Sequence, residues 1–595
     1  MGNYHHKEAR EGTDYRSKKR MVGGAKTQPT SPSQLDAQVA ARFLNYATLG
    51  ADYETIMSVA KQGISNWLEK QFSLAPAVSF TDTTRKIWEH FYPQYIKIWG
   101  RSYIVNHGDA VLPYWYYWKM AWWHNILTSE DLLRQRVTQA LSQVFVISEH
   151  SNLQLSGVGM ANYYDLLYRH AFGNFREMLY DISLHPMMGF YLSHINNPKS
   201  DPSRNIHPDE NYAREIMQLF SIGLFELHQD GTPKLDAKGE KIPTYDNQDI
   251  KEFAKIFTGL APAGYYWPWK DYSRIKTAWG SEYNESPAST ITWEPMIPFE
   301  AWHEAGEKKL LNGQIVPAGQ STLQDIAHAI DNLFHHPNVG PFLGKLLIQR
   351  LVKSNPTPAY VGRVAAAFND NGQGERGDMK AVIRAILTDA EALDLSWRSD
   401  PQAGKLKEPL LRYTQALRAF KVTNQSGRLW NWGYLFDEAV SQGILASPSV
   451  FNFYLPNFQP NGPLADADLV APEFQIHTSA TSINYINLVY GWFIKDYLGE
   501  IATHAGTTVH NAPSYELDDL DPVDYLYLDL EAEYQMAADA PALVARLNLI
   551  LTGGQFSKET ISHIVQAVEQ VKDPVQRVRI ALFLSFIAPD YCIQK

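Results

Sequence analysis

Apolar residues recur at helical spacing through most of the folded part of the chain. The stretch 129–148 is the clearest case, because Leu133, Val137 and Leu141 fall on one face of a 3.6-residue repeat. Runs that alternate apolar and polar residues, as strands do, are few. The pattern therefore predicts an all-α, mostly helical fold, with a small β-hairpin excursion near residues 228–246.

The same pattern predicts one large multi-helix domain over residues 36–595, because no linker divides this span. Residues 1–35 are polar and include a basic run at 16–20, so we expect a disordered basic tail. Residues 261–300 form an aromatic insertion without periodicity. A long irregular segment inside a domain is usually functional, so this one either covers a cleft or packs its aromatic rings back into the core.

The stretch 207–224 carries a concentrated set of ionisable side chains on one predicted helix face. Asp209 is a suitable capping residue at its start, and Gly223 is a suitable end. The apolar residues fall on one side of the helix. The other side presents Glu210, Asn211, Arg214, Glu215, Gln218 and Ser221. Such a face is either a solvated surface with an i,i+4 ion pair or the wall of a binding cleft.

Composition argues against several classes of function. The net charge of −11 does not favour nucleic acid as a partner, since that needs a basic surface. Cys592 is the single cysteine, so neither an internal disulfide nor a cysteine-based metal site is expected. No apolar run reaches roughly 18 residues, so no membrane span is predicted. Residues 1–35 show no signal peptide, because they lack its apolar centre.

Known catalytic signatures are also missing from the sequence. No nucleophile elbow, phosphate loop or dinucleotide fingerprint appears. His185, His207, His303 and His336 lack the tight spacing of a metal motif, so any metal site would need ligands from distant segments. His185 and His336 each precede a proline, which favours a backbone-bonded residue at a helix start. No cofactor is predicted, although the sequence leaves a divalent metal open.

Short motifs follow one another in order from about residue 40 to the C-terminus. They are Ala41-Arg42-Phe43-Leu44, Leu133-Arg134-Gln135-Arg136-Val137, Asn174-Phe175-Arg176, Pro208-Asp209-Glu210-Asn211-Tyr212-Ala213-Arg214-Glu215, Phe257-Thr258-Gly259, His336-Pro337-Asn338, Glu408-Pro409, Ser447-Pro448-Ser449-Val450-Phe451-Asn452 and Ala471-Pro472-Glu473-Phe474. In these motifs the chain resembles the bacterial domain of unknown function 1800 (DUF1800) family. The resemblance implies a periplasmic or secreted protein with a sulfatase-like partner protein. One departure is His303-Glu304, where the family leads us to expect His-Asp.

Paired carboxylates and aromatic faces are what a carbohydrate-active enzyme requires. We therefore expect an extracytoplasmic glycoside hydrolase or polysaccharide lyase acting on a polysaccharide or other glycan, with Arg214 holding an acidic sugar or sulfate. The candidate catalytic residues are Glu215, Glu210, Asp209, Arg214 and His303. The candidate substrate-binding residues are Asn211, Trp267, Trp269, Trp279, Arg350, Glu408 and Glu473.

Two further hypotheses use the same residues. A non-catalytic glycan-binding, partner-binding or assembly protein would use the charged face and the aromatic insertion as its interface. A metal-dependent enzyme would assemble histidine and carboxylate ligands instead. Under the leading hypothesis the cleft is walled by residues 209–224, 261–304 and 447–474. Taken singly, each carboxylate is more often a surface or capping residue than a catalytic one.

Overall fold

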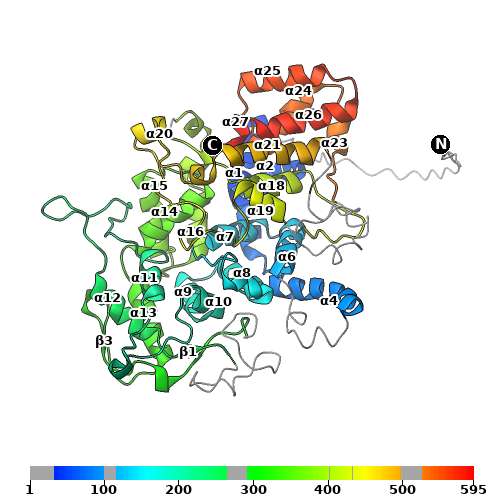
Figure 1. Cartoon of the computed structure of the whole chain (residues 1–595). Helices are drawn as coiled ribbons and strands as arrows, with labels where there is room; N and C mark the ends of the chain where they lie inside the picture. The colour runs from blue at the N-terminus through cyan, green and yellow to red at the C-terminus, as the bar shows by residue number, and fades with distance from the viewer. Residues whose placement is uncertain are drawn as a thin grey trace, which may run out of the picture.

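Helices dominate the computed structural model of the chain, as Figure 1 shows, and this confirms the all-α prediction. The strands of the described residues form three two-stranded antiparallel sheets. The structure describes residues 33–99, 115–263, 291–400, 402–431, 433–495, 498 and 526–595. Most of the predicted basic tail and of the aromatic insertion, with Trp267, Trp269 and Trp279, lies outside these ranges, so those predictions stay predictions.

Helix α1 contacts α2 and α7 of the first part of the chain, and also α16, α17 and α24 from later parts. The Ser33 hydroxyl and Asp36 form a capping box that starts α1. The bounds of this group are α1 (Gln34–Ala47), α2 (Tyr53–Gln62), α3 (Ile64–Ser73), α4 (Phe80–Trp99), α6 (Trp115–Thr128), α7 (Leu132–Ser142), α8 (Gly157–His170), α9 (Phe175–Leu184) and α10 (Pro186–Tyr191).

Aromatic side chains of α6 fill the space between these helices. Trp118 and Trp122 are buried, and the Trp122 ring meets the Trp123 ring edge to face with centroids 4.8 Å apart. Large flat rings bury much apolar area for few rotatable bonds, which suits such a layer. The sequence predicts this burial, since the segment is too aromatic on all sides for a solvated helix.

The central segment contains α11, which is shorter than the predicted span 209–224. It ends at Gln218, and the next turn closes with bonds from the Ile222 and Gly223 N–H groups to the Met217 carbonyl. Gly223 has φ +71°, so it supplies the left-handed residue that ends a helix in this way. The segment comprises α11 (Asn211–Gln218), α12 (Asn247–Ile256), β1 (Leu260–Ala261), β2 (Ile297–Pro298), β3 (Lys308–Lys309), β4 (Ile315–Val316) and α13 (Thr322–Phe334).

The predicted hairpin region contains isolated antiparallel bridges in place of full strands. These bridges join Phe225 to Pro243, Leu227 to Pro233, and Leu235 to Lys241. Prolines lack the N–H group that a longer ladder needs, which limits the pairing here. The chain therefore makes a short β-like excursion between α11 and α12.

Helices from the second half of the chain, α16, α17 and α24, pack against α1. The C-terminal strand β6 pairs with β5, with Lys405 opposite Gln594 and Leu406 opposite Ile593. The elements are α14 (Val339–Leu351), α15 (Pro358–Asn369), α16 (Met379–Leu387), α17 (Ala390–Leu393), β5 (Lys405–Leu406), α18 (Pro409–Ala419), α19 (Tyr434–Val440), α20 (Pro463–Asp466), the 3-10 helix η8 (Pro472–Ile476), α21 (Ser479–Ile494), α23 (Glu531–Gln535), α24 (Ala540–Thr552), α25 (Lys558–Glu569), α26 (Pro574–Ile587), α27 (Pro589–Cys592) and β6 (Ile593–Gln594).

One continuous hydrophobic core extends from Ala40 in α1 to Tyr591 in α27. A shared core of this kind is what a single large domain requires. In Figure 1, α24, α25 and α26 lie at the upper end of the molecule, whereas α9 to α13 lie in its lower part. Among the described helices, none is both long and apolar enough to cross a membrane.

Candidate functional site

Helix α11 is held in place by the ring of Tyr212 on its buried face. The Tyr212 hydroxyl bonds to the Ser183 hydroxyl at 2.6 Å, which ties α11 to α9. The His194 ring stacks on Tyr212 with centroids 3.9 Å apart, and Phe257 meets the same ring edge to face. Rigid packing on this side fixes the direction of the polar side chains on the other.

Helix α11 begins one residue later than an Asp209 cap predicts, since its N-cap is Glu210, but the Asp209 carboxylate still bonds to its first N–H group. An Asp209 carboxylate oxygen accepts a 2.8 Å bond from the Asn211 N–H group. The Asp209 N–H group itself donates to the Asn197 side chain at 2.8 Å. Burial raises the pKa of Asp209, although the bond from Asn211 opposes that rise.

Glu210 and Arg214 form the predicted i,i+4 ion pair on the surface of α11. Their charged atoms are 3.5 Å apart, and the side chains are 39% and 44% exposed. Asn211 beside them is also exposed. An exposed pair at this distance contributes little to stability. The Arg214 guanidinium therefore keeps N–H groups available for another anion.

Glu215 lies one turn beyond Asn211, but it is buried, with 6% of its surface exposed. Its Oε2 atom has no hydrogen-bond partner among the described residues. Burial raises the pKa of Glu215, and the charge of Arg214 offsets this only in part. Such a carboxyl group keeps its proton to a higher pH than an exposed one, which suits a general acid.

His303 lies in a different setting from α11. It is buried, with Nε2 2.9 Å from Asp325 and Nδ1 3.0 Å from the Thr258 carbonyl oxygen. The Lys308 ammonium group binds the same Asp325 oxygen. Both ring nitrogens of His303 are therefore engaged within the protein in this arrangement, and its predicted catalytic role stays a prediction.

Glu304, which stands where the family leads us to expect aspartate, has contacts separate from those of the His303 ring. The acid that pairs with His303 is Asp325 of α13, while Glu304 accepts a bond from the Ser200 N–H group at 3.2 Å. The acidic partner of the histidine is thus supplied by a residue distant in the sequence. A neighbouring aspartate is not required for this pair.

Three predicted binding residues, Arg350, Glu408 and Glu473, meet in the interior around Lys405. With Arg136 these residues form what we call the buried charge cluster: Arg136, Arg350, Lys405, Glu408 and Glu473. The Lys405 ammonium group is 3.0 Å from a Glu473 oxygen and 3.6 Å from a Glu408 oxygen. Both Lys405 and Arg136 donate to the Arg350 carbonyl oxygen, at 2.9 and 2.6 Å.

The charges of this cluster hold Glu408 in its ionised form. Burial opposes ionisation of Glu408, but the charges of Lys405 and Arg136, with a 2.5 Å bond from the Gln143 amide, outweigh it and lower its pKa. The Arg350 guanidinium lies over the Tyr454 ring, 4.6 Å from its centroid. Some hydrogen-bonding capacity stays unused, since Arg136 Nε, Arg350 Nε and both Glu473 oxygens have no hydrogen-bond partner among the described residues.

The two carboxylates of the cluster share one ammonium group, so they lie close together, as the carboxyl pair of a glycosidase also does. However, Glu408 is 0% and Glu473 1% exposed, so a polymer does not reach them in this arrangement. A cavity of about 10 Å³ nearby, lined by Gln139, Gln143 and Ser447 among others, has room for about one water molecule. The geometry suits a structural ion network better than a binding site.

The two His-Pro motifs act at helix starts, which confirms the sequence-based interpretation. His185 Nδ1 accepts from the Met187 N–H group, and His336 Nδ1 accepts from the Asn338 N–H group, each at 3.2 Å. His207 is exposed. Across the described ranges, no group of three or more histidine, cysteine, aspartate or glutamate side chains is arranged to hold a metal ion.

Sequence reasoning missed the partners that complete these sites, namely Arg136, Lys308, Asp325 and Lys405. The run 404–409, Gly-Lys-Leu-Lys-Glu-Pro, offered a signal, because two lysines precede a glutamate directly before a helix. Asp325 gave no local signal, since it lies on a regular helix and its partners come from another segment.

Comparison with known proteins identifies one family. The family model described as "Protein of unknown function (DUF1800)" matches residues 42–593, nearly the whole chain. No curated protein and no solved structure matches.

Proposed function

This chain belongs to the DUF1800 family, and we propose that it is an extracytoplasmic polysaccharide-active enzyme, a glycoside hydrolase or a polysaccharide lyase. Its site is the polar flank of α11, which consists of Asp209, Glu210, Asn211, Arg214 and Glu215. The observation that supports the proposal is the Glu215 carboxyl group, which is buried, has an oxygen without a partner among the described residues and has a raised pKa.

In the proposed mechanism Glu215 is the proton donor. It gives its proton to the glycosidic oxygen as the bond to the leaving sugar breaks. A second carboxylate, Asp209 or Glu210, completes the pair. In a hydrolase it attacks the anomeric carbon or takes a proton from the attacking water, and in a lyase it takes the proton from the sugar carbon.

Arg214 favours a polyanionic substrate within this proposal. Its guanidinium group is exposed, and its one ionic contact among the described residues is the 3.5 Å pair with Glu210. A guanidinium fork binds carboxylate or sulfate oxygens through paired N–H groups. The exposed Asn211 amide beside it can donate to or accept from sugar hydroxyl groups.

The test is a Glu215→Gln variant assayed on acidic and neutral polysaccharides for new reducing ends and for unsaturated sugars. We expect turnover to fall by about 100-fold or more, because general acid catalysis contributes about that much, while polymer binding persists. The matched control is Glu240→Gln, at an exposed glutamate in the excursion after α11. Unchanged turnover in Glu215→Gln would remove the proposed mechanism.

A non-catalytic glycan-binding or partner-binding protein is the second candidate. It is favoured by the burial and pairing of His303, Glu408 and Glu473, which leaves the acids of α11 without those catalytic partners. Under this alternative the wild-type protein binds an acidic polymer and releases no product. Glu215→Gln then binds as tightly as the wild-type protein, and Arg214→Met binds less tightly.

A further inference from the structure

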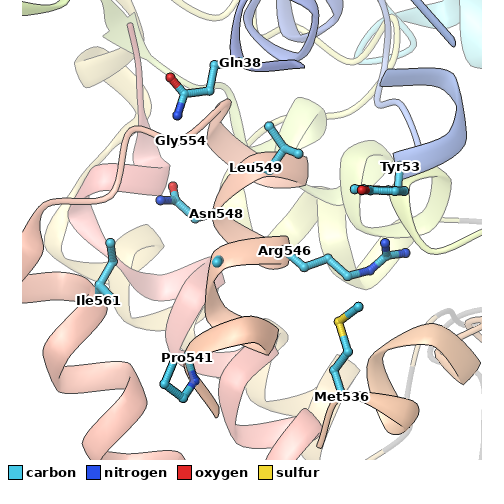
Figure 2. Close-up of a pocket in the computed structure, with 10 residues that line it drawn as sticks. Gln38, Tyr53, Met536, Pro541, Arg546, Asn548, Leu549, Gly554 and Ile561 are labelled. Carbon is cyan, nitrogen blue, oxygen red and sulfur yellow. The ribbon is translucent and has the colours of Figure 1, made fainter. Parts of the chain in front are cut away.

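A cavity of about 430 Å³ lies where α24 meets α1, α2, α23 and α25, as Figure 2 shows. Its volume falls in the range of roughly 300–1,000 Å³ that is usual for small-molecule sites. None of the residues that line it belongs to the polar flank of α11 or to the buried charge cluster. In Figure 1 this end of the molecule is well separated from α11.

The apolar part of the cavity follows one face of α24. Pro541, Ala545 and Leu549 are spaced four residues apart and therefore lie along one side of the helix. The side chains of Met536 and Ile561 add further apolar wall. Ala545 is small and exposed, so the middle of this face stays open where a larger residue would fill it.

Asn548 presents a fixed hydrogen-bond donor to the cavity. Its Oδ1 atom accepts from the Thr552 hydroxyl at 2.6 Å and from the Phe556 N–H group at 2.9 Å. These two bonds set the orientation of the amide and leave Nδ2 without a partner among the described residues. Asn548 as a residue is 8% exposed. A ligand with an acceptor oxygen would satisfy it.

Gln38 of α1 lines the cavity near Asn548, and its side-chain amide has no hydrogen bond within the described part of the chain. It passes close to Gly554, where an added Cβ would lie 2.6 Å from the Gln38 nitrogen. Glycine at this position therefore leaves room for the amide. Gln38 and Asn548 together place polar groups on one side of an otherwise apolar cavity.

Arg546 supplies a positive charge on the other side of α24. Its Nε atom bonds to the buried Glu533 carboxylate at 2.6 Å, and its guanidinium lies over the Tyr53 ring, 4.2 Å from the centroid. Figure 2 shows Arg546 extending toward Tyr53 and Met536. Because Arg546 bonds to Glu533 through Nε, its two terminal nitrogens are left to bind another group. Two such nitrogens can bind one carboxylate through paired N–H groups.

We propose that this cavity binds a small organic acid with an apolar body. The carboxylate pairs with the terminal N–H groups of Arg546, and the apolar body covers Ala545 and Leu549. The Asn548 amide donates to a further oxygen of a larger natural ligand. The site is independent of the proposed function at α11.

The test uses 4-phenylbutyrate as the probe and 4-phenylbutan-1-ol as its neutral analogue, with the full chain, by titration calorimetry. We expect the acid to bind with a dissociation constant in the millimolar range or tighter. The alcohol should bind about tenfold or more weakly, because it lacks the charge-assisted hydrogen bonds. Equal binding of the two probes, or binding of neither at millimolar concentration, would overturn the proposal.

Two substitutions in α24 locate the probe. Ala545→Phe fills the cavity and should abolish binding of 4-phenylbutyrate. Ala542→Phe places the same ring at an exposed position of the helix that does not line the cavity, and binding should be unchanged. Circular dichroism checks that both variants fold. Binding retained by Ala545→Phe would place the probe elsewhere and refute the assignment.

A third variant leaves α24 unchanged and alters α1 instead. Gln38→Ala removes an amide that makes no hydrogen bond among the described residues, so the fold should be unaffected. 4-Phenylbutyrate should bind to it with nearly wild-type affinity, since its carboxylate is assigned to Arg546. A loss of more than about tenfold, the equivalent of a charge-assisted bond, would show that the carboxylate lies at Gln38 and contradict the proposed orientation.

Discussion

The polar flank of α11 and the buried charge cluster contain the same kinds of side chain in opposite surroundings. On the flank, Glu210 and Arg214 form an exposed pair, and the buried Glu215 has one carboxylate oxygen without a hydrogen-bond partner among the described residues. In the cluster, Glu408 and Glu473 share the ammonium group of Lys405 and are fully buried. The chemical content of a motif therefore does not decide whether its charges serve a ligand or the fold.

The exposed and the buried charges differ in how much their stability depends on neighbouring groups. An exposed ion pair is already solvated, so it contributes roughly 0–1 kcal/mol. A charge inside the protein depends on its partners, because removing one of them leaves an uncompensated ion in a medium of low polarity. The cluster joins α7, α14, β5, α18 and η8, so its charges connect segments from distant parts of the chain.

The largest effect is expected from Lys405→Met in the cluster. The substitution keeps the volume but leaves Glu408 and Glu473 without their shared ammonium group. We expect the free energy of unfolding to fall by about 3–5 kcal/mol, measured by denaturant titration. Lys558→Met, at an exposed lysine that begins α25, is the control and should change stability by less than about 0.5 kcal/mol. If Lys405→Met and Lys558→Met had similar free energies of unfolding, the buried charge cluster would not be stabilising the fold.

The interior beneath α11 should respond to acid through His194. Burial lowers the pKa of this histidine to about 4 from an ordinary value of 6.5. The unfolded chain therefore binds a proton between about pH 6.5 and 4 that the folded protein does not. Stability from this group falls as pH falls through that window, by up to about 1.4 kcal/mol per pH unit. His185, which burial holds at a pKa of about 3, acts in the same direction.

The measurement compares the pH dependence of stability in the wild-type protein and in His194→Gln. The difference isolates one proton, since all other titrating groups are common to both. The groups that face His194 are the Ser183 carbonyl oxygen, Tyr212 and Phe257, and none of them is charged near neutral pH. Equal slopes in wild type and His194→Gln would refute the assignment.

Replacing a glutamate by glutamine should change the free energy of unfolding in opposite directions in the two regions. Burial raises the pKa of Glu215, so its ionised form destabilises the folded protein at neutral pH, and stability from this group falls as pH rises. Glu215→Gln removes that charge and should stabilise by about 1 kcal/mol while abolishing the proposed turnover. Glu408 has a lowered pKa and contributes stability above the ordinary carboxyl range, so Glu408→Gln should destabilise.

Thermal and denaturant unfolding of both variants at neutral pH would test this. Destabilisation by Glu215→Gln would mean that its carboxylate has an ionic partner in the folded protein. Stabilisation by Glu408→Gln would mean that Lys405 and Arg136 do not compensate its charge. Either result would remove the distinction between a flank available to ligands and a cluster that holds the fold together.

Local sequence predicted the elements well, because each helix carries its own periodicity and caps. The bond from the Asn211 N–H group to Asp209, the turn at Gly223 and the exposed pair Glu210–Arg214 all depend on residues within a few positions of one another. The burial of Glu215 depends on more distant residues. Helical periodicity indicates which face of α11 carries Glu215, but it does not indicate which neighbouring segment covers that face. Glu215 interacts electrostatically with Tyr245, a residue just before α12.

The contacts that decided the candidate site join segments far apart in the sequence. The acid that His303 meets is Asp325, which comes from another segment, and nothing near His303 in the sequence indicates it. Glu408 and Glu473 meet through Lys405, and no spacing in the sequence indicates that meeting. The cavity beside α24 exists because Ala545 is small where several helices converge, which is a property of packing and has no motif.

The smallest effect on stability is expected from Arg214→Met on the flank. The exposed pair with Glu210 contributes little, so the free energy of unfolding should change by less than about 0.5 kcal/mol, and less still at high salt, which screens exposed charges. Binding of a sulfated or uronic acid polymer, measured by calorimetry, should nevertheless weaken by about tenfold, because a charge-assisted contact is lost. Lys238→Met, at an exposed lysine in the excursion after α11, should leave both quantities unchanged. A large loss of stability in Arg214→Met would show that the flank supports the fold as the buried cluster does. Unchanged binding would show that its guanidinium group does not meet the substrate.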